Sequence, residues 1–197
     1  SIESQNLNLV SAVHPLIGKN PKPLSVTLNP DQKILVITGP NTGGKTVALK
    51  TVGLLAAMQQ SGIHITGKPG TQIPVFDGIY ADIGDQQNIE GALSTFSSHI
   101  KNLKNIIKVA TPKSLVLLDE IGSSTDPEEG AAIGSAVLEY LADHNITTLA
   151  TTHHSPIVIT SEENPKMKNA SFHLNPDTLS PTYELQEGIS GRSYALS

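Results

Sequence analysis

The chain contains no cysteine among its 197 residues. This absence excludes a disulfide scaffold and a thiolate zinc site, so the core has to be held together by packing alone. Such a composition suits the reducing cytoplasm, which is the location we expect. The length accommodates one well-packed domain with a sizeable core, and we expect residues 1–197 to form that domain.

Long hydrophobic runs are also missing. The longest apolar run within a helical pattern, residues 52–58, is far shorter than the roughly 20 residues that a membrane-spanning helix requires. The N-terminal residues show no basic segment followed by an apolar one, as a secretory signal would. We therefore expect no membrane partner.

Basic residues are scarce as well, with 13 Lys and Arg against 18 Asp and Glu and a net charge of −5. A protein that binds nucleic acid on its own normally carries a basic surplus, because it has to neutralise phosphates. We expect any nucleic acid to be bound by domains outside this chain. The sequence starts at Ser1 rather than Met and stops at Ser197 in mid-pattern, so we expect a fragment of a larger protein.

What is present is an alternation of short apolar runs and helical patterns. That order predicts an α/β fold with βαβ units and a mostly parallel sheet. The run at 115–118 has no polar alternation, which is typical of a central strand covered on both faces. We expect strands at 34–38, 115–118 and 147–151, and helices at 46–60 and 127–141.

Two helices have clear boundary signals. Apolar residues recur every three or four positions between 89 and 110, and Pro112 ends that amphipathic helix. The helix at 127–141 opens after Asp126, which we expect to cap it, with Pro127 in the first turn and Glu129 completing a capping box. We expect its buried stripe to consist of Ile133, Val137 and Leu141.

The two ends of the chain differ in pattern. Residues 171–174 and 182–185 are β-like and flank Asn175-Pro176-Asp177, which predicts a peripheral antiparallel hairpin with a longish loop. Residues 2–30, rich in proline and asparagine, are expected to be irregular or edge structure.

A glycine-rich segment with the spacing G-x-x-x-x-G-K-[ST] follows the predicted strand 34–38 and precedes a predicted helix. Phosphates need backbone N–H groups turned inward, which glycines permit, and the positive end of a helix. Lys45 adds a positive charge and Thr46 a hydroxyl for Mg²⁺. The alternative is a glycine-rich turn that binds nothing. We interpret the segment, with Val47 after it, as the binding site for the phosphates of ATP: Gly39, Pro40, Asn41, Thr42, Gly43, Gly44, Lys45 and Thr46.

Two carboxylates, Asp119 and Glu120, directly follow the predicted central strand. They are expected at the carboxyl edge of the sheet, where parallel sheets bind their ligands. We expect Asp119 to hold Mg²⁺, Glu120 to polarise the water that attacks the γ-phosphate, and Lys45 to assist catalysis. A solvated pair of charges at a strand end is the alternative, and the phosphate-binding segment in the same sheet favours the catalytic interpretation.

Two further segments are ambiguous from the residues alone. His153 follows the strand 147–151, so it should lie at the same edge and can sense the γ-phosphate, although a lone histidine is more often structural. Metal binding by His153 and His154 is not expected, because adjacent side chains diverge and no further ligands stand at fixed spacing. The segment 94–99 opens a helix with several hydroxyls, which fits an anion site or only a well-capped helix.

Together, four segments in this order resemble the ATPase domain of the MutS family. The likeness is greatest to its second bacterial branch, which is associated with a small nuclease domain. Thr46 stands where the mismatch-repair branch usually has Ser, and the residues after Phe96 and around Asp126 also resemble the second branch. The four segments are Thr38 to Thr46, Ser94-Thr95-Phe96-Ser97-Ser98-His99, Asp119-Glu120-Ile121-Gly122 with Gly130, and Thr151-Thr152-His153.

The resemblance implies a P-loop NTPase of ABC type, whose mostly parallel sheet is flanked by helices. It implies a homodimer in which each Mg²⁺-ATP is closed over by the second copy. In that arrangement Ser94 and Thr95 form a signature that contacts the partner's γ-phosphate, Asp126 belongs to an interface loop, and His153 is a switch. Adenine would lie near His14 and residues 21–24.

The function implied is ATP hydrolysis that drives conformational change in a DNA-associated clamp, in DNA repair or recombination control. Any nuclease activity would lie outside this chain. The ATPase domain of a mismatch-repair protein or of a ribosome-associated MutS-type protein is the alternative within the family. The sequence departs from the family at three places: His154 for Tyr, Ser123-Ser124 for smaller residues, and Tyr194 for Asn.

Proteins of other classes share some of these features. A transporter nucleotide-binding domain should carry a Leu-Ser-Gly-Gly-Gln type signature, which residues 94–99 do not match. A nucleotide kinase should have an arginine-rich lid, and Arg192 is the only arginine. A binding module that uses ATP for conformation with negligible turnover remains open.

Overall fold

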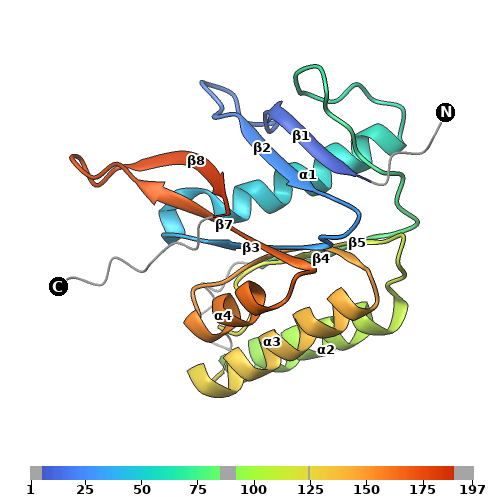
Figure 1. Ribbon diagram of the computed structural model, residues 1–197, viewed down its shortest axis with the longest axis vertical. Coiled ribbons are helices and arrows are strands. Elements are labelled where there is room, and N and C mark those ends of the chain that lie inside the picture. The colour runs from blue at the N-terminus through green and yellow to red at the C-terminus, as the bar shows by residue number, and fades with distance from the viewer. Residues whose placement is uncertain (1–5, 85–91, 124, 189–197) are drawn as a thin grey trace.

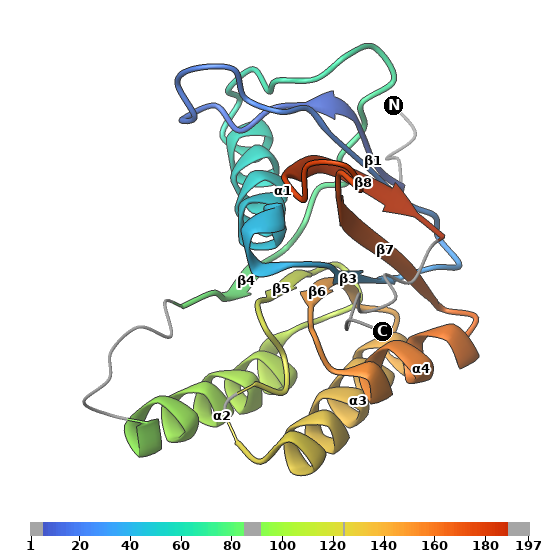
Figure 2. The same ribbon diagram turned by 90° about the vertical axis from the view of Figure 1, so that its left-hand side faces the viewer.

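The computed structural model describes residues 6–84, 92–123 and 125–188, which form three layers (Figure 1). A six-stranded sheet lies in the middle. One face carries helix α1 and a small sheet of two antiparallel strands, and the other face carries the remaining helices (Figure 2). The helices are α1 (Lys45–Gln60), α2 (Ala92–Val109), α3 (Pro127–Asp143) and α4 (Ser155–Glu163), and the small sheet consists of β1 (Leu7–Ala12) and β2 (Leu24–Leu28).

The central sheet has the strand order β4-β5-β6-β3-β7-β8. All neighbours are parallel except β8, which pairs with β7 as an antiparallel hairpin. The predicted α/β class, the mostly parallel sheet and the peripheral hairpin are thereby confirmed. The strands are β3 (Ile34–Thr38), β4 (Ile79–Asp82), β5 (Leu115–Leu118), β6 (Thr147–Thr151), β7 (Met167–Leu174) and β8 (Pro181–Glu187).

Two hydrophobic cores flank the sheet, because successive side chains of a strand point to opposite faces. In β3, Leu35 and Ile37 pack toward α1 and the small sheet, while Ile34 and Val36 pack toward α2, α3 and α4. All five residues of β3 and all four of β5 are buried, as the absence of polar alternation predicts for central strands.

The stripe predicted for α3 is partly wrong. Val137 and Leu141 are buried, whereas Ile133 is exposed. Gly134 takes the buried position instead, and a Cβ there would lie 2.6 Å from Ile157 Cδ1 of α4. The close crossing of α3 and α4 therefore requires a small residue at this face and turns Ile133 about 100° away from it.

The expectation for residues 2–30 is also partly wrong. Within this segment β1 and β2 are regular strands, and the leucines at 7, 9 and 28 are buried against α1. Strand β4 and helix α4 were not predicted, and the predicted helix at 89–110 is described from Ala92. Among the described residues, no helix is both long and apolar enough to cross a membrane.

Candidate active site

The parallel strands place three of the predicted segments at one edge of the sheet. The segment 39–46, hereafter the phosphate loop, follows β3, and Asp119 and Glu120 follow β5. Strand β6 lies between β3 and β5, so its carboxyl end separates these two segments. Thr151, the last residue of β6, therefore lies between the phosphate loop and the carboxylates.

The path of the phosphate loop is set by its first glycine. Gly39 has a φ of +121°, and a Cβ there would lie 2.5 Å from the carbonyl oxygen of Phe172 on β7. Only glycine adopts this conformation with the neighbouring strand so close. The loop then forms one short turn, Asn41–Gly43, and leads into α1, whose first N–H groups have no partner within the helix.

Lys45 is held inside the phosphate loop. The residue is only 2% exposed, and Nζ donates hydrogen bonds to Gly39 O at 2.5 Å and Asn41 Oδ1 at 2.9 Å. Burial lowers the pKa of the ammonium, and the carboxylates of Glu120 and Asp119 oppose that shift. The cation is thus oriented by the loop and lies within electrostatic reach of both carboxylates.

A chain of hydroxyls and carboxylates links the three segments. Thr46 Oγ1 donates to Asp119 Oδ2 at 2.7 Å, and Thr151 Oγ1 donates to Asp119 Oδ1 at 2.6 Å. The same Thr151 hydroxyl accepts from the backbone N–H of Glu120 at 2.7 Å. Asp119 is therefore fixed by a threonine on either side, with both carboxylate oxygens occupied.

Glu120 follows in a turn with a positive φ of +48°, which is uncommon for a residue with a side chain. Its carbonyl oxygen accepts from Ser123 Oγ at 2.6 Å, and the N–H of Ile121 donates to Thr151 O at 2.9 Å. Backbone bonds on both sides hold this conformation, and the half-buried Glu120 lies close enough to Lys45 to affect its pKa.

The loop after Glu120 is attached to α3 by a close backbone approach. A Cβ on Gly130 would lie 1.9 Å from Gly122 O, so both segments need glycine here. Asp126 caps α3 as predicted, and its Oδ1 accepts from the N–H groups of Glu128 and Glu129 at 3.0 and 3.4 Å. The Asp126 side chain is exposed.

The two histidines after β6 differ in their surroundings. His153 is exposed and lies beside His154, with ring centroids 4.3 Å apart. His154 is half-buried against Gly122, and burial together with His153 lowers its pKa. Within the described ranges, no group of three or more His, Cys, Asp or Glu is arranged to hold a metal ion.

The predicted signature lies at the start of α2. Ser94 and Thr95 belong to its first turn, and their side chains lie outside the described part of the structure. Ser124 and Tyr194, two of the departures from the family pattern, also lie outside the described residues.

A pocket of about 370 Å³ adjoins the phosphate loop. It lies between the N-terminal segment and the start of α1, and it includes His14 and residues 21–24. Val47 and Tyr183 are both partly exposed there, and Gly43 and Gly44 of the loop form one wall. A planar group bound in this pocket would be continuous with the phosphate loop.

The sequence reasoning missed several residues of this region. The sequence predicts Thr151 as the end of a strand and as part of the family resemblance, and no bond to Asp119 or Glu120 was predicted for it, although its place at a strand end beside two carboxylates is a signal for one. Phe172 and Tyr183 belong to the predicted hairpin, and nothing in their spacing shows that the hairpin folds back onto the phosphate loop.

Comparison with known proteins assigns the chain to a family. The family model for MutS domain V matches residues 35–197. Proteins named Endonuclease MutS2 are similar to nearly the whole chain, which spans only about a quarter of their length. The relative from Halothermothrix orenii is 52% identical over 190 residues (96% of this chain, 24% of the relative). Those from Alkaliphilus metalliredigens and Caldicellulosiruptor bescii are 49% identical over 192 residues (97% and 24%) and 51% identical over 191 residues (96% and 24%).

These relatives support the second bacterial branch, MutS2, over the mismatch-repair branch. The family model covers all of the central sheet apart from the first residue of β3. The chain belongs to the MutS domain V family.

Proposed function

We propose that this chain binds ATP with Mg²⁺ and hydrolyses it to ADP and phosphate, as a P-loop ATPase of ABC type. One observation carries the proposal: the hydroxyl of Thr46, at the start of α1, is hydrogen-bonded to the carboxylate of Asp119 at 2.7 Å. A phosphate loop whose Thr is joined to an acid at the end of another strand of the same sheet is the arrangement that P-loop ATPases use for Mg²⁺.

The donor atoms fit that ion. Mg²⁺ prefers oxygen ligands and keeps several waters, so one hydroxyl and one nearby carboxylate are sufficient protein ligands. Thr46 would hold it directly and Asp119 through water, and the bound ion would neutralise charge on the β- and γ-phosphates. Thr151 keeps Asp119 oriented toward Thr46.

We also propose binding positions for the phosphates and the base of the nucleotide. Lys45 and the first N–H groups of α1 provide the positive charge for the phosphates. The adjoining pocket accommodates the base between Val47, Tyr183 and the segment at 21–24. Because the pocket includes Gly43 and Gly44, a single nucleotide would occupy the pocket and the phosphate loop together.

Glu120 is the group we propose to polarise the attacking water. It follows Asp119 directly, and its backbone is held in an unusual conformation by Thr151 and Ser123. Conformations of this kind persist where surrounding bonds enforce them, and they cluster at active sites. Its carboxylate lies near Lys45 and hence near the bound phosphates.

We further propose that the working unit is a homodimer with composite sites. Ser94 and Thr95, at the N-terminus of α2, would contact the γ-phosphate held by the second copy. Asp126 and the exposed His153 would lie at the interface between the copies. In the full-length protein, ATP turnover would then open and close a DNA-associated clamp, consistent with relatives named Endonuclease MutS2.

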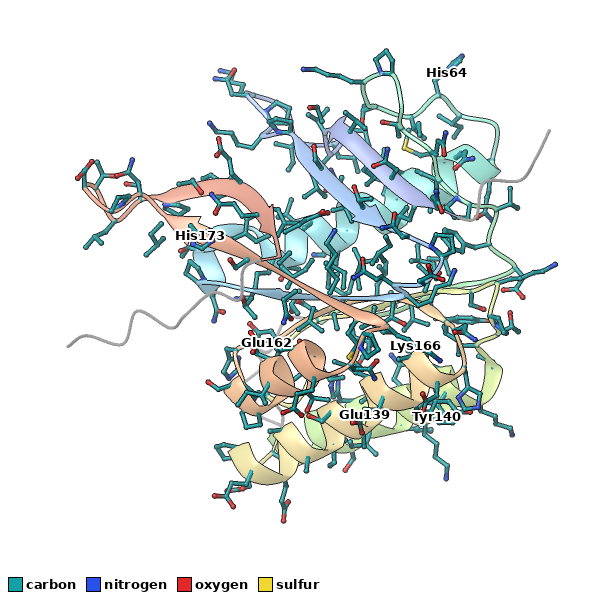
Figure 3. The ribbon with its side chains drawn as sticks, viewed as in Figure 1. His64, Glu139, Tyr140, Glu162, Lys166 and His173 are labelled. Carbon is teal, nitrogen blue, oxygen red and sulfur yellow. The ribbon has the colours of Figure 1, made fainter. Side chains whose placement is uncertain are left out.

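The test is phosphate release by the full-length protein and its Glu120→Gln variant. We expect at least a roughly hundredfold loss of turnover, because a general base contributes about that much, while ATP binding is kept. Glu139→Gln, an exposed substitution on α3 (Figure 3), is the matched control and should leave the rate unchanged. Equal rates near zero in all three proteins would instead indicate a nucleotide-binding module without turnover.

A further inference from the structure

A polar cluster outside the proposed ATP site joins α2 to the edge of the sheet. Asp82, the last residue of β4, accepts a hydrogen bond from Asn102 Nδ2 on Oδ1 at 2.8 Å. Its other oxygen, Oδ2, lies 2.5 Å from His99 Nδ1, so the carboxylate and the imidazole are in direct polar contact. The side chains of Asp82 and His99 are 13% and 18% exposed, so this contact is largely removed from water.

The same aspartate also contacts the proposed ATP site through its backbone. Asp82 O accepts from the N–H of Asp119 at 2.9 Å, directly after the last paired residue of β5. One residue thus binds α2 with its side chain and the proposed Mg²⁺ ligand with its carbonyl group. Asp82 therefore lies between α2 and the main chain of Asp119 and contacts both.

Adhesion of α2 to the sheet does not require this cluster. Leu103 and Ile106 of the same helix are buried in the core below the sheet and already supply apolar packing. Burying a carboxylate and an imidazole costs free energy that apolar side chains would not cost. Asp82 Oδ2 and His99 Nε2 are moreover buried without a hydrogen-bond partner among the described residues, which adds to that cost.

The polar cluster defines the orientation of α2 relative to the sheet. His99 and Asn102 stand three residues apart on α2, so both face the same carboxylate from successive turns. The hydrogen bond from Asn102 and the close polar contact with His99 hold one carboxylate from two turns of α2, and together they fix the rotation of the helix about its axis as well as its distance from the sheet. Apolar contacts permit sliding that these polar contacts resist.

We propose that Asp82, His99 and Asn102 are positioning residues that couple the Asp119 side of one ATP site to the signature on the same chain. The proposal rests on the proposed function, in which Ser94 contacts the ATP of the second copy. Ser94 precedes His99 by five residues, or roughly 7.5 Å along the helix. The orientation of α2 then couples the ATP site of this chain to the ATP site of the second copy, which the signature of this chain contacts.

The proposal predicts that substitutions in this cluster lower turnover and leave ATP binding nearly unchanged. His99→Ala and Asn102→Ala should each lower kcat of the full-length protein about tenfold, because the signature is no longer aligned. The Kd for ATP should change less than twofold, since the phosphate loop and the pocket are untouched. ATP-dependent association of the two ATPase domains, measured by cross-linking or fluorescence transfer, should weaken in parallel.

Conservative and matched variants separate positioning from general destabilisation. His99→Asn places a donor near the position of Nδ1 and should restore kcat to within about threefold of the wild type. Asn105→Ala, an exposed substitution on α2, and His64→Ala, on the exposed loop after α1 (Figure 3), should leave kcat unchanged. If His99→Ala does not fold, His99→Asn and Asn102→Ala provide the same comparison.

Each failure has its own result. Wild-type protein that neither binds nor hydrolyses ATP would overturn the proposed function and the coupling with it. Wild-type turnover together with unchanged kcat in His99→Ala and Asn102→Ala would overturn the coupling alone. Variants that melt at lower temperature but keep the wild-type kcat would show that the cluster is merely structural, which also contradicts the proposal.

Discussion

Thr46 and Asp119 stand 73 residues apart in the chain and are joined by a hydrogen bond of 2.7 Å. The bond connects the first turn of α1 to the carboxyl end of β5 across the intervening strand β6. It is possible because parallel strands end at one edge, so a loop after β3 and an acid after β5 meet there. The hydrogen bond orients the Thr46 hydroxyl toward the Asp119 carboxylate, so the two residues are aligned and not merely close.

Removal of the positive charge of Lys45 should strongly weaken nucleotide binding. In Lys45→Ala, the phosphates lose a charged hydrogen-bond donor, a change of about 1.5–3 kcal/mol or roughly 10- to 150-fold in Kd. Calorimetry with ATP measures this loss directly. Lys50→Ala, an exposed substitution five residues further along α1, is the control and should bind like the wild type. Unchanged affinity in Lys45→Ala would contradict the assignment of the phosphate loop.

Thr151 should matter for stability and turnover together. In Thr151→Val, which has nearly the same shape, Asp119 Oδ1 loses a donor and the N–H of Glu120 loses its acceptor. Leaving such buried groups unpaired costs about 1–3 kcal/mol, and misplaced carboxylates should lower kcat roughly 10- to 100-fold. Thr151→Ser keeps the hydroxyl and should stay close to the wild type in urea unfolding and phosphate release. Similar losses in both variants would assign the effect to packing.

The sequence predicted those parts of the fold that local patterns determine. The predicted strands at 34–38, 115–118 and 147–151 match the structure, because a short apolar run bounded by turn signals is typical of a buried strand. The position of segment 39–46 between a strand and a helix is confirmed, and its role in phosphate binding stays a prediction that rests on its spacing and that position. The cap at Asp126 follows from its own neighbours in sequence.

Features that depend on packing between distant segments were missed. Ile133 has the right spacing for a buried stripe, yet the approach of α4 favours Gly134. Strand β4 is short and half-exposed, so it has little apolar pattern, and only its pairing with β5 defines it. The pocket beside the phosphate loop combines residues 14–24 with Phe172 and Tyr183, a contact that no local signal encodes.

The close approach of Gly122 and Gly130 makes a stability prediction. Gly130→Ala would place a Cβ 1.9 Å from Gly122 O, so the backbone has to shift. We expect the free energy of unfolding to fall by about 1–3 kcal/mol, the usual cost of overpacking. Gly18→Ala is the matched control, since no atom lies within 4 Å of its Cβ. Denaturant titration of both variants tests this prediction. Equal unfolding midpoints would show that the backbone after Glu120 can shift without loss of stability.

The half-buried His154 should make stability depend on pH. Burial and the neighbouring His153 hold its pKa below the ordinary value of 6.5, so the unfolded chain binds a proton more readily than the folded one. This contribution to the free energy of unfolding is fully present above about pH 6.5 and is lost as the pH falls toward the folded-state pKa. His154→Gln removes it, and the variant should lose less stability than the wild type between about pH 8 and pH 5.5. His64→Gln, a change at an exposed histidine, should keep the wild-type slope in urea titrations at both pH values. Parallel slopes for His154→Gln and His64→Gln would show that protonation of His154 does not oppose folding.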